Sequence, residues 1–247
     1  MTTATKLFHF FAGLYHLYFI SYATIHEIAH PNYSSFAGRW KTLTFLSCMI
    51  NCWYFLAVFC HDFVLSFVLP ESINKKIKKV LDGLFDGVVC PAAILVVTAF
   101  WGLYYYNRAA IWPLKMDAII PPLYNHMMHT LLAPIALIEL ALYRHHYLSL
   151  GGGLFLCTAY TGGYVAWLHV VRSIGGIWAY PIFYKLDFNG RCNFIGVIVA
   201  AMYVIFFAQH FLHQLVHGGE VEESSIKKQK QDGKVLKGKK GKSRKAD

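Results

Sequence analysis

Long apolar stretches separated by short polar segments dominate this chain. A helix that crosses a bilayer needs about 20 predominantly apolar residues. Six stretches meet that need, at residues 7–25, 43–69, 84–106, 124–142, 151–171 and 193–215. The pattern therefore predicts an all-α, polytopic membrane protein with six transmembrane helices.

The first stretch has a second interpretation, a cleavable signal peptide. His9, Tyr15, His16 and Tyr18 interrupt its apolar run, and no small-x-small cleavage site follows. We therefore expect residues 7–25 to remain as an uncleaved span.

Three local patterns refine this picture. Residues 75–79 carry four lysines and are expected to form a compact basic loop. Gly162-Gly163 predicts a close helix contact in the fifth span, because small residues let helices approach in membranes. Asn32-Tyr33-Ser34 has the pattern of a glycosylation acceptor.

Lysine and arginine counts in the polar segments predict the orientation. One side receives Lys6, the 75–79 run, Arg144 and the ten basic residues after Gly218, sixteen in all. The other side receives the remaining seven of the chain's 23 lysines and arginines. Both termini are therefore expected in the cytoplasm, with the spans in the plasma membrane or the endoplasmic reticulum.

The composition agrees with a membrane protein. Hydrophobic residues make up 56% of the chain and charged residues 15%, whereas soluble domains carry about 25% charged residues. The six cysteines lie in or at the ends of apolar runs without CxxC spacing, so we expect buried, reduced thiols.

The net charge of +10 raises the question of nucleic-acid binding. Residues 218–247 carry ten Lys or Arg and five Asp or Glu, but no aromatic side chain for base stacking. We predict a disordered cytoplasmic tail that contacts anionic lipid headgroups, and no nucleic-acid partner. The expected organisation is a membrane domain at 1–217 and the tail at 218–247.

The candidate chemistry lies where the fourth span begins. Asn125 and His129 are four residues apart, and His126 and His129 are three apart, so a helix presents them on one face. Ionisable groups at a membrane helix end are functional candidates. With this topology the second span begins on the same side, and Thr44 lies about 6 Å below Trp40 at 1.5 Å per residue. His129 lies at a similar depth, so the two residues are able to meet.

A threonine hydroxyl becomes a nucleophile when a nearby histidine takes its proton, and the histidine then returns that proton to the leaving group. Asn125 is a candidate to donate to the developing oxyanion or to orient the imidazole, and His126 a candidate substrate contact. The ordinary alternative for Thr44 is a helix-packing hydroxyl bonded to its own backbone. For His129 it is an interfacial histidine. No GxSxG motif occurs, which argues against an ordinary α/β-hydrolase.

Several separated motifs, in order between about residues 30 and 197, carry a resemblance to the family of the androgen-induced gene 1 product and the androgen-dependent TFPI-regulating protein. They are Gly38-Arg39-Trp40-Lys41-Thr42-Leu43-Thr44-Phe45, Phe100-Trp101 with Tyr104, Ile119-Ile120-Pro121, Asn125-His126-Met127-Met128-His129-Thr130, Leu137-Ile138-Glu139 and Gly176-Ile177-Trp178-Ala179-Tyr180-Pro181.

This resemblance implies a multi-pass threonine hydrolase that cleaves fatty acid esters of hydroxy fatty acids without a cofactor or metal. It places the nucleophile at Thr44 and the catalytic histidine at His129. The chain departs from the family at Arg172-Ser173, where a His-His pair is expected, and in its long lysine tail.

Two other functional classes remain open. The 13 histidines include His210, His213 and His217 on one helix face, and His9 and His16 on one face of the first span. His61 and His145-His146 are expected at the same level, as in a metal- or haem-binding lipid oxidoreductase. Their spacings are not the HxxxH and HxxHH patterns expected of a di-iron oxidase. The third class is a non-catalytic membrane receptor or regulator.

Trp178 and Tyr180, in the segment between the fifth and sixth spans, are interpreted as interfacial anchors.

Overall fold

The fold is a bundle of helices, without a strand in the part of the chain that the structure describes. The structure is a computed structural model describing residues 2–25, 35–146 and 149–243, with side chains up to Gly218. The all-α prediction is confirmed. The Asn32 acceptor pattern lies outside the described residues.

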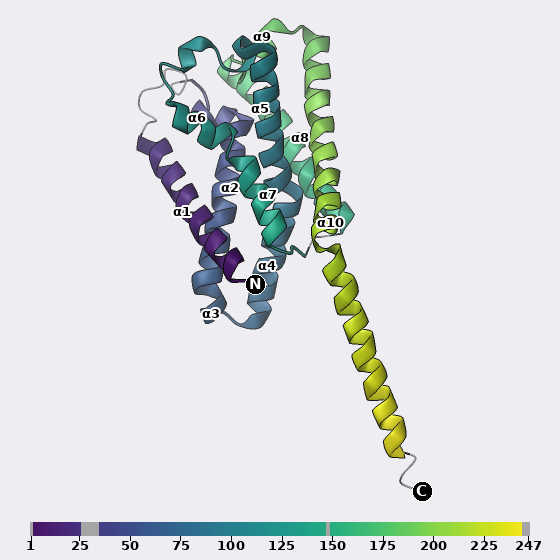
Figure 1. Ribbon diagram of the computed structural model, residues 1–247. Coiled ribbons are helices and arrows are strands. Elements are labelled where there is room, and N and C mark those ends of the chain that lie inside the picture. Colours follow the sequence, from purple (N-terminus) through teal and green to yellow (C-terminus); the bar gives the residue numbers. More distant parts are fainter. Residues whose placement is uncertain (1, 26–34, 147–148, 244–247) are drawn as a thin grey trace. The chain divides into compact units, whose positions relative to one another are not determined.

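The principal helices follow the chain in order (Figure 1). They are α1 (Thr3–Ile25), α2 (Leu43–Cys60), α3 (Ser66–Val68), α4 (Glu71–Leu84), α5 (Cys90–Ile111), α6 (Pro122–His129), α7 (Leu132–Leu142), α8 (Leu150–Gly175), α9 (Ile182–Lys185) and α10 (Phe188–Ser243). Two π-helical segments, η4 (His61–Leu65) and η5 (Phe85–Val89), interrupt them, and the 3₁₀ helices η3 (Gly38–Lys41) and η6 (Leu114–Met116) precede α2 and α6.

Four helical stretches among the described residues are long and apolar enough to cross a membrane. They are Leu43–Val68, Glu71–Ile111, Leu150–Gly175 and Phe188–Gly218. α1 is helical over 23 residues but is not among them, and α7 is a shorter apolar helix. A membrane protein is therefore supported, whereas six spans are not confirmed.

The predicted fourth span is two helices rather than one. α6 ends at His129, Thr130 leaves helical geometry at φ −122° and ψ −50°, and α7 begins at Leu132. Pro134 explains the break, because its ring would collide with the carbonyl of residue 130 in a continuous helix. His129 consequently lies at the end of a short helix.

The predicted basic loop at residues 75–79 is helical and lies inside α4. Ile77 and Leu81 recur at helical spacing and are half-buried, while the lysines take the exposed faces. α4 continues through η5 into α5. The polarity of this segment marks an amphipathic helix rather than a loop.

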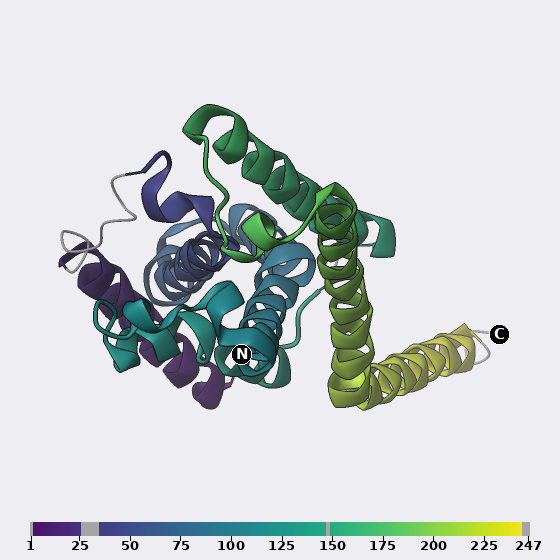
Figure 2. The same ribbon diagram turned by 90° about the horizontal axis from the view of Figure 1, so that it is seen from above.

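α2 and α5 lie at the centre of residues 1–209 (Figures 1 and 2). α1 and α7 pack on one side, where Phe19, Phe55 and Leu140 contribute to the main core. On the other side, Cys157 of α8 and Phe206 of α10 pack with Leu95 of α5 in a second core cluster. Both α2 and α5 carry side chains to the two cavities described below.

The close helix contact occurs elsewhere than at Gly162-Gly163, where an added Cβ would meet nothing within 4 Å. At Gly153 an added Cβ would lie 2.6 Å from the Asp86 carboxylate, and at Gly87 it would lie 2.6 Å from Leu156. α8 and η5 therefore approach each other at these two glycines.

The backbone of α10 is helical through Ser243, so the predicted disorder of residues 218–247 is not confirmed. Lysine and glutamine, which are frequent there, have good helix propensity. The six cysteines are free thiols, of which Cys60 and Cys192 are exposed and the other four buried.

Charged side chains are buried together at the end of the bundle that contains α3 and α4. His9 bridges two carboxylates, with Nδ1 2.6 Å from Asp62 Oδ2 and Nε2 2.8 Å from Glu139 Oε2. The Tyr54 hydroxyl donates to the other Glu139 oxygen at 2.9 Å. His145 Nδ1 lies 3.0 Å from Asp82 Oδ1. These contacts join α1, α2, η4 and α7, and they join α4 to the segment after α7.

Replacing Glu139 with leucine should destabilise the protein by about 3–5 kcal/mol, because it leaves His9 Nε2 and the Tyr54 hydroxyl buried without their acceptor. The thermal unfolding midpoint of the detergent-solubilised protein measures this loss. Glu71→Gln is the matched control, because Glu71 is 82% exposed in its pair with Lys75 and should contribute below about 1 kcal/mol. Equal midpoints for the two variants would contradict a stabilising role for the cluster.

Candidate functional site

Thr44 and His129 line one cavity of about 420 Å³. Its walls come from the start of α2, the end of α5, α6 and the segment at residues 179–181. The structure therefore brings the two residues singled out in the sequence to one site. The short helix α6, which ends at His129, lies at the end of the bundle opposite α3 (Figure 1).

Thr44 occupies the first turn of α2. The Thr42 side chain caps this helix by accepting from the Phe45 amide at 3.3 Å, and the Thr42 carbonyl accepts from the Leu46 amide. Thr44 itself is half-buried. The amino end of a helix carries a partial positive charge that stabilises a nearby anion. A negative charge that forms beside Thr44 is therefore favoured by its position.

His129 is held by its partners on three sides. Its Nδ1 is 2.7 Å from the Asn125 side-chain oxygen and 3.2 Å from the Asn125 carbonyl. Both are acceptors, so Nδ1 carries the proton and Nε2 keeps a lone pair. The ring stacks on Phe100 at a centroid distance of 3.6 Å and meets the edge of Trp112 at 5.6 Å. His129 is thus oriented as a proton acceptor.

Asn125 lies on the predicted face of the helix, and its side-chain oxygen is engaged by His129. Of the two roles suggested by the sequence, this contact favours orienting the imidazole. His126 is exposed and turned aside, with Nδ1 3.0 Å from the Thr130 hydroxyl and its ring stacked on Trp101. It is not among the residues that line the cavity with His129.

Replacing Asn125 with leucine should reduce turnover by about 10- to 100-fold. A wrongly oriented catalytic histidine costs up to about 10⁴-fold in serine proteases, but here the Asn125 backbone carbonyl remains as an acceptor. We expect the loss in kcat, measured by steady-state kinetics on protein whose unfolding midpoint matches the wild type. An unchanged kcat would contradict the orienting role.

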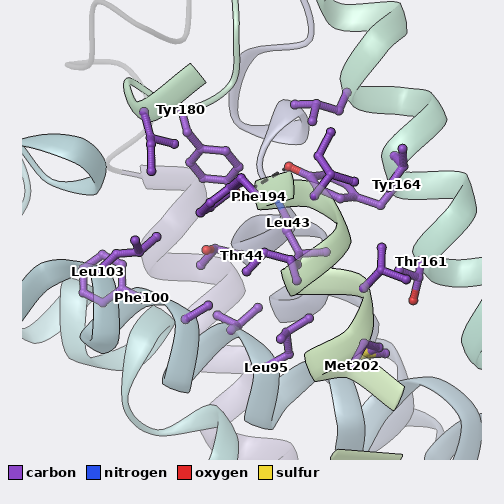
Figure 3. A pocket seen from close by; sticks show the side chains of 18 of the residues that line it. Leu43, Thr44, Leu95, Phe100, Leu103, Thr161, Tyr164, Tyr180, Phe194 and Met202 are labelled. Carbon is purple, nitrogen blue, oxygen red and sulfur yellow. Dashed lines mark hydrogen bonds between the residues drawn. The ribbon is translucent and has the colours of Figure 1, made fainter. Parts of the chain in front are cut away.

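A second, smaller cavity of about 90 Å³ meets the first at Thr44, Phe100, Ile111 and Tyr180, which line both. Apolar side chains of α5, α8 and α10 form most of its wall, among them Leu95, Leu168 and Met202. Figure 3 shows Thr44 beside this apolar space, with Tyr164 and Tyr180 around it. Thr44 therefore lies between a cavity that has basic residues in its wall and a more apolar cavity.

The larger cavity has basic residues in its wall, namely Arg39, Lys41 and Lys115. Burial lowers the pKa of Lys41, and its ammonium group donates to the Ser35 hydroxyl at 2.6 Å. The Arg39 guanidinium lies 4.9 Å from the centre of the Phe45 ring. This wall favours an anionic or strongly polar group in the ligand.

Tyr180 is the site residue that the sequence did not indicate. An interfacial anchor was expected, but its hydroxyl reaches the start of α2 and accepts from the Leu43 amide at 2.8 Å. The contact joins residues 137 positions apart. Its only sequence signal is membership of the Gly176–Pro181 motif, which has no spacing relation to Thr44.

The histidines of the metal alternative have other partners. His9 and His145 bond to carboxylates, and His61 Nδ1 is 3.1 Å from Asp62 Oδ1. On α10, the rings of His213 and His217 are 4.8 Å apart. Within the described residues, no group of three or more His, Cys, Asp or Glu side chains is arranged to hold a metal ion.

Comparison with known proteins adds a family. Residues 4–214 match the family model described as FAR-17a/AIG1-like protein. The human androgen-dependent TFPI-regulating protein is 33% identical over 209 residues, which cover 82% of this chain and 90% of the relative. The human androgen-induced gene 1 protein is 29% identical over 197 residues, which cover 76% and 82%. No solved structure matches.

Proposed function

The chain belongs to the FAR-17a/AIG1-like family, and we propose that it is a membrane-embedded lipid ester hydrolase. Thr44 is the nucleophile and His129 the general base and acid. The observation that carries this proposal is that both side chains line one cavity, with Nε2 of His129 available to accept a proton.

The reaction proceeds in two halves. The Thr44 oxygen attacks the ester carbonyl while Nε2 of His129 takes the hydroxyl proton. Collapse of the tetrahedral intermediate breaks the ester C–O bond, and His129 protonates the departing alcohol. Water then attacks the acyl-threonine with His129 again as base. As the intermediate collapses, the bond from carbon to the Thr44 oxygen breaks, His129 returns the proton to that oxygen, and the carboxylic acid leaves.

The substrates are fatty acid esters of hydroxy fatty acids, which are cleaved to a fatty acid and a hydroxy fatty acid. The resemblance described above suggests this class, and the two cavities support it. The smaller, more apolar cavity suits a hydrocarbon chain, and the larger one brings Arg39, Lys41 and Lys115 within reach of a free carboxylate. Thr44 lies between them, where the ester bond of such a molecule would be placed.

The test is hydrolysis by the full-length protein, purified in detergent and returned to lipid vesicles. A fatty acid ester of a hydroxy fatty acid is supplied, and both products are measured by mass spectrometry. We expect release of the two acids in equal amounts, with slower turnover when the free carboxylate is converted to an amide. Product formation no faster than in protein-free vesicles would contradict the proposed function.

A further inference from the structure

Tyr180 lies against Thr44 although it comes from a distant part of the chain. It belongs to the segment between α8 and α9, and its side chain lines both cavities, as Thr44 does. Its hydroxyl is 2.8 Å from the Leu43 amide, one residue before Thr44 (Figure 3). Leu43 and Thr44 are consecutive residues in the first turn of α2, so the contact holds the phenol beside that turn. The phenol is therefore a neighbour of the proposed nucleophile.

The hydrogen bonds at Tyr180 leave its proton for the cavity. The phenol oxygen accepts from the Leu43 amide at 2.8 Å and from the Tyr164 hydroxyl at 3.3 Å, and Tyr164 shares its one proton with the Lys41 carbonyl, also at 3.3 Å. A phenol has one proton to donate in addition to what it accepts. Because two donors already approach the oxygen, its own O–H is directed away from them, toward the cavities that Tyr180 shares with Thr44.

The phenol stays protonated at neutral pH. Burial raises the pKa of Tyr180 above its ordinary value, and the hydrogen bonds from Tyr164, Leu43 and Thr44 offset only part of that rise. A neutral phenol in a water-poor site is a strong hydrogen-bond donor to an anion.

We propose that Tyr180 donates a hydrogen bond to the oxyanion that forms when Thr44 attacks the ester carbonyl. This role rests on the proposed hydrolase function and adds a third catalytic residue to it. In the attack, the bond from the Thr44 oxygen to carbon forms, the carbonyl π electrons move to oxygen, and the proton goes to His129. Tyr180 keeps its proton throughout. The positive end of α2 acts on the same oxyanion.

A purely structural role is the competing explanation, because the Tyr180 oxygen also caps the first amide of α2. Removing a cap destabilises a helix without a selective effect on the transition state. The two explanations differ in what the loss of the hydroxyl does to kcat, KM and analogue binding.

Tyr180→Phe removes only the hydroxyl, and we expect kcat to fall by about 10²- to 10³-fold, the cost of an oxyanion donor, with KM within about threefold. Tyr203→Phe is the matched control. Tyr203 lines neither of the two cavities, and its hydroxyl bonds to Thr158 at 2.9 Å. Its kcat should remain within about threefold of the wild type, as for a substitution that removes no transition-state contact.

Two substrate analogues separate catalysis from structure. A trifluoromethyl ketone in place of the ester forms an oxyanion with Thr44, whereas an ether analogue does not. Tyr180→Phe should weaken binding of the ketone by about 100-fold, as the loss of one charged hydrogen bond predicts, and leave ether binding unchanged. Equal weakening of both analogues, or an unchanged kcat, would overturn the proposal.

Tyr164→Phe provides a second variant in case Tyr180→Phe does not fold. It keeps the Tyr180 hydroxyl but removes one donor to it, so ketone binding should weaken by less than in Tyr180→Phe while ether binding stays constant. An unchanged affinity for the ketone in this variant would count against the proposed network.

A wild-type protein that hydrolyses the ester while Tyr180→Phe remains fully active would reject only the role of Tyr180. An inactive wild type would reject the hydrolase function with it.

Discussion

Replacing Thr44 with alanine should reduce ester hydrolysis by about 10³-fold or more and abolish labelling by a fluorophosphonate probe. Loss of a catalytic nucleophile removes the covalent route, and the residual rate comes from the remaining groups of the site alone. Thr44 is also the point at which the two cavities meet, so it is the group positioned to reach an ester bond held across them. Product release measured by mass spectrometry and gel fluorescence of the probe check the two effects.

Two variants control this experiment. Thr44→Ser keeps the hydroxyl and should retain both labelling and measurable hydrolysis. Thr98→Ala removes an exposed hydroxyl that bonds to its own helix at Ile94, and it should leave the rate unchanged. Probe labelling that persists in Thr44→Ala would assign the nucleophile to another residue.

Replacing His129 with glutamine should reduce kcat by about 10²- to 10⁴-fold, the usual contribution of a general acid–base group. Glutamine is polar, but it does not accept a proton near neutral pH. Because His129 and Thr44 act in the same step, the double variant Thr44→Ala/His129→Gln should be no slower than Thr44→Ala alone. Steady-state kinetics of the three variants measure the coupling.

His126→Gln is the matched control, since His126 belongs to the same short helix but is exposed and bonded to Thr130. Its activity should remain within about threefold of the wild type, as is usual for a surface substitution. If His126→Gln and His129→Gln had equal effects, the assignment of the base to His129 would be wrong.

The sequence predicted the class of fold and the location of Thr44 and His129, because hydropathy and topology determine which helix ends share a side of the membrane. It did not predict the break at Thr130, since Pro134 lies within an apolar run that by composition continues unbroken. Tyr180 was missed for a different reason. Its contact with Leu43 depends on how a segment between two helices folds back, which periodicity does not encode.

The carboxylate partners of His9 were also not predicted. His9, Asp62 and Glu139 are each isolated charges in separate apolar stretches, and only their packing makes them a network. By contrast, helical spacing was sufficient to predict that Asn125 and His129 lie on one face, because the two residues are one turn apart.

The π-helical segment η5 sets the angular phase between the two ends of the helical run Glu71–Ile111. An α-helix advances by about 100° per residue, and a π turn accommodates one residue more than an α turn. Asp82, before η5, pairs with His145, whereas Phe100, after η5, stacks on His129. The direction in which Phe100 points around its helix therefore depends on the extra residue that η5 accommodates, ten or more positions earlier in the chain. The number of residues in η5, rather than the identity of their side chains, aligns the Phe100 ring with the imidazole of His129.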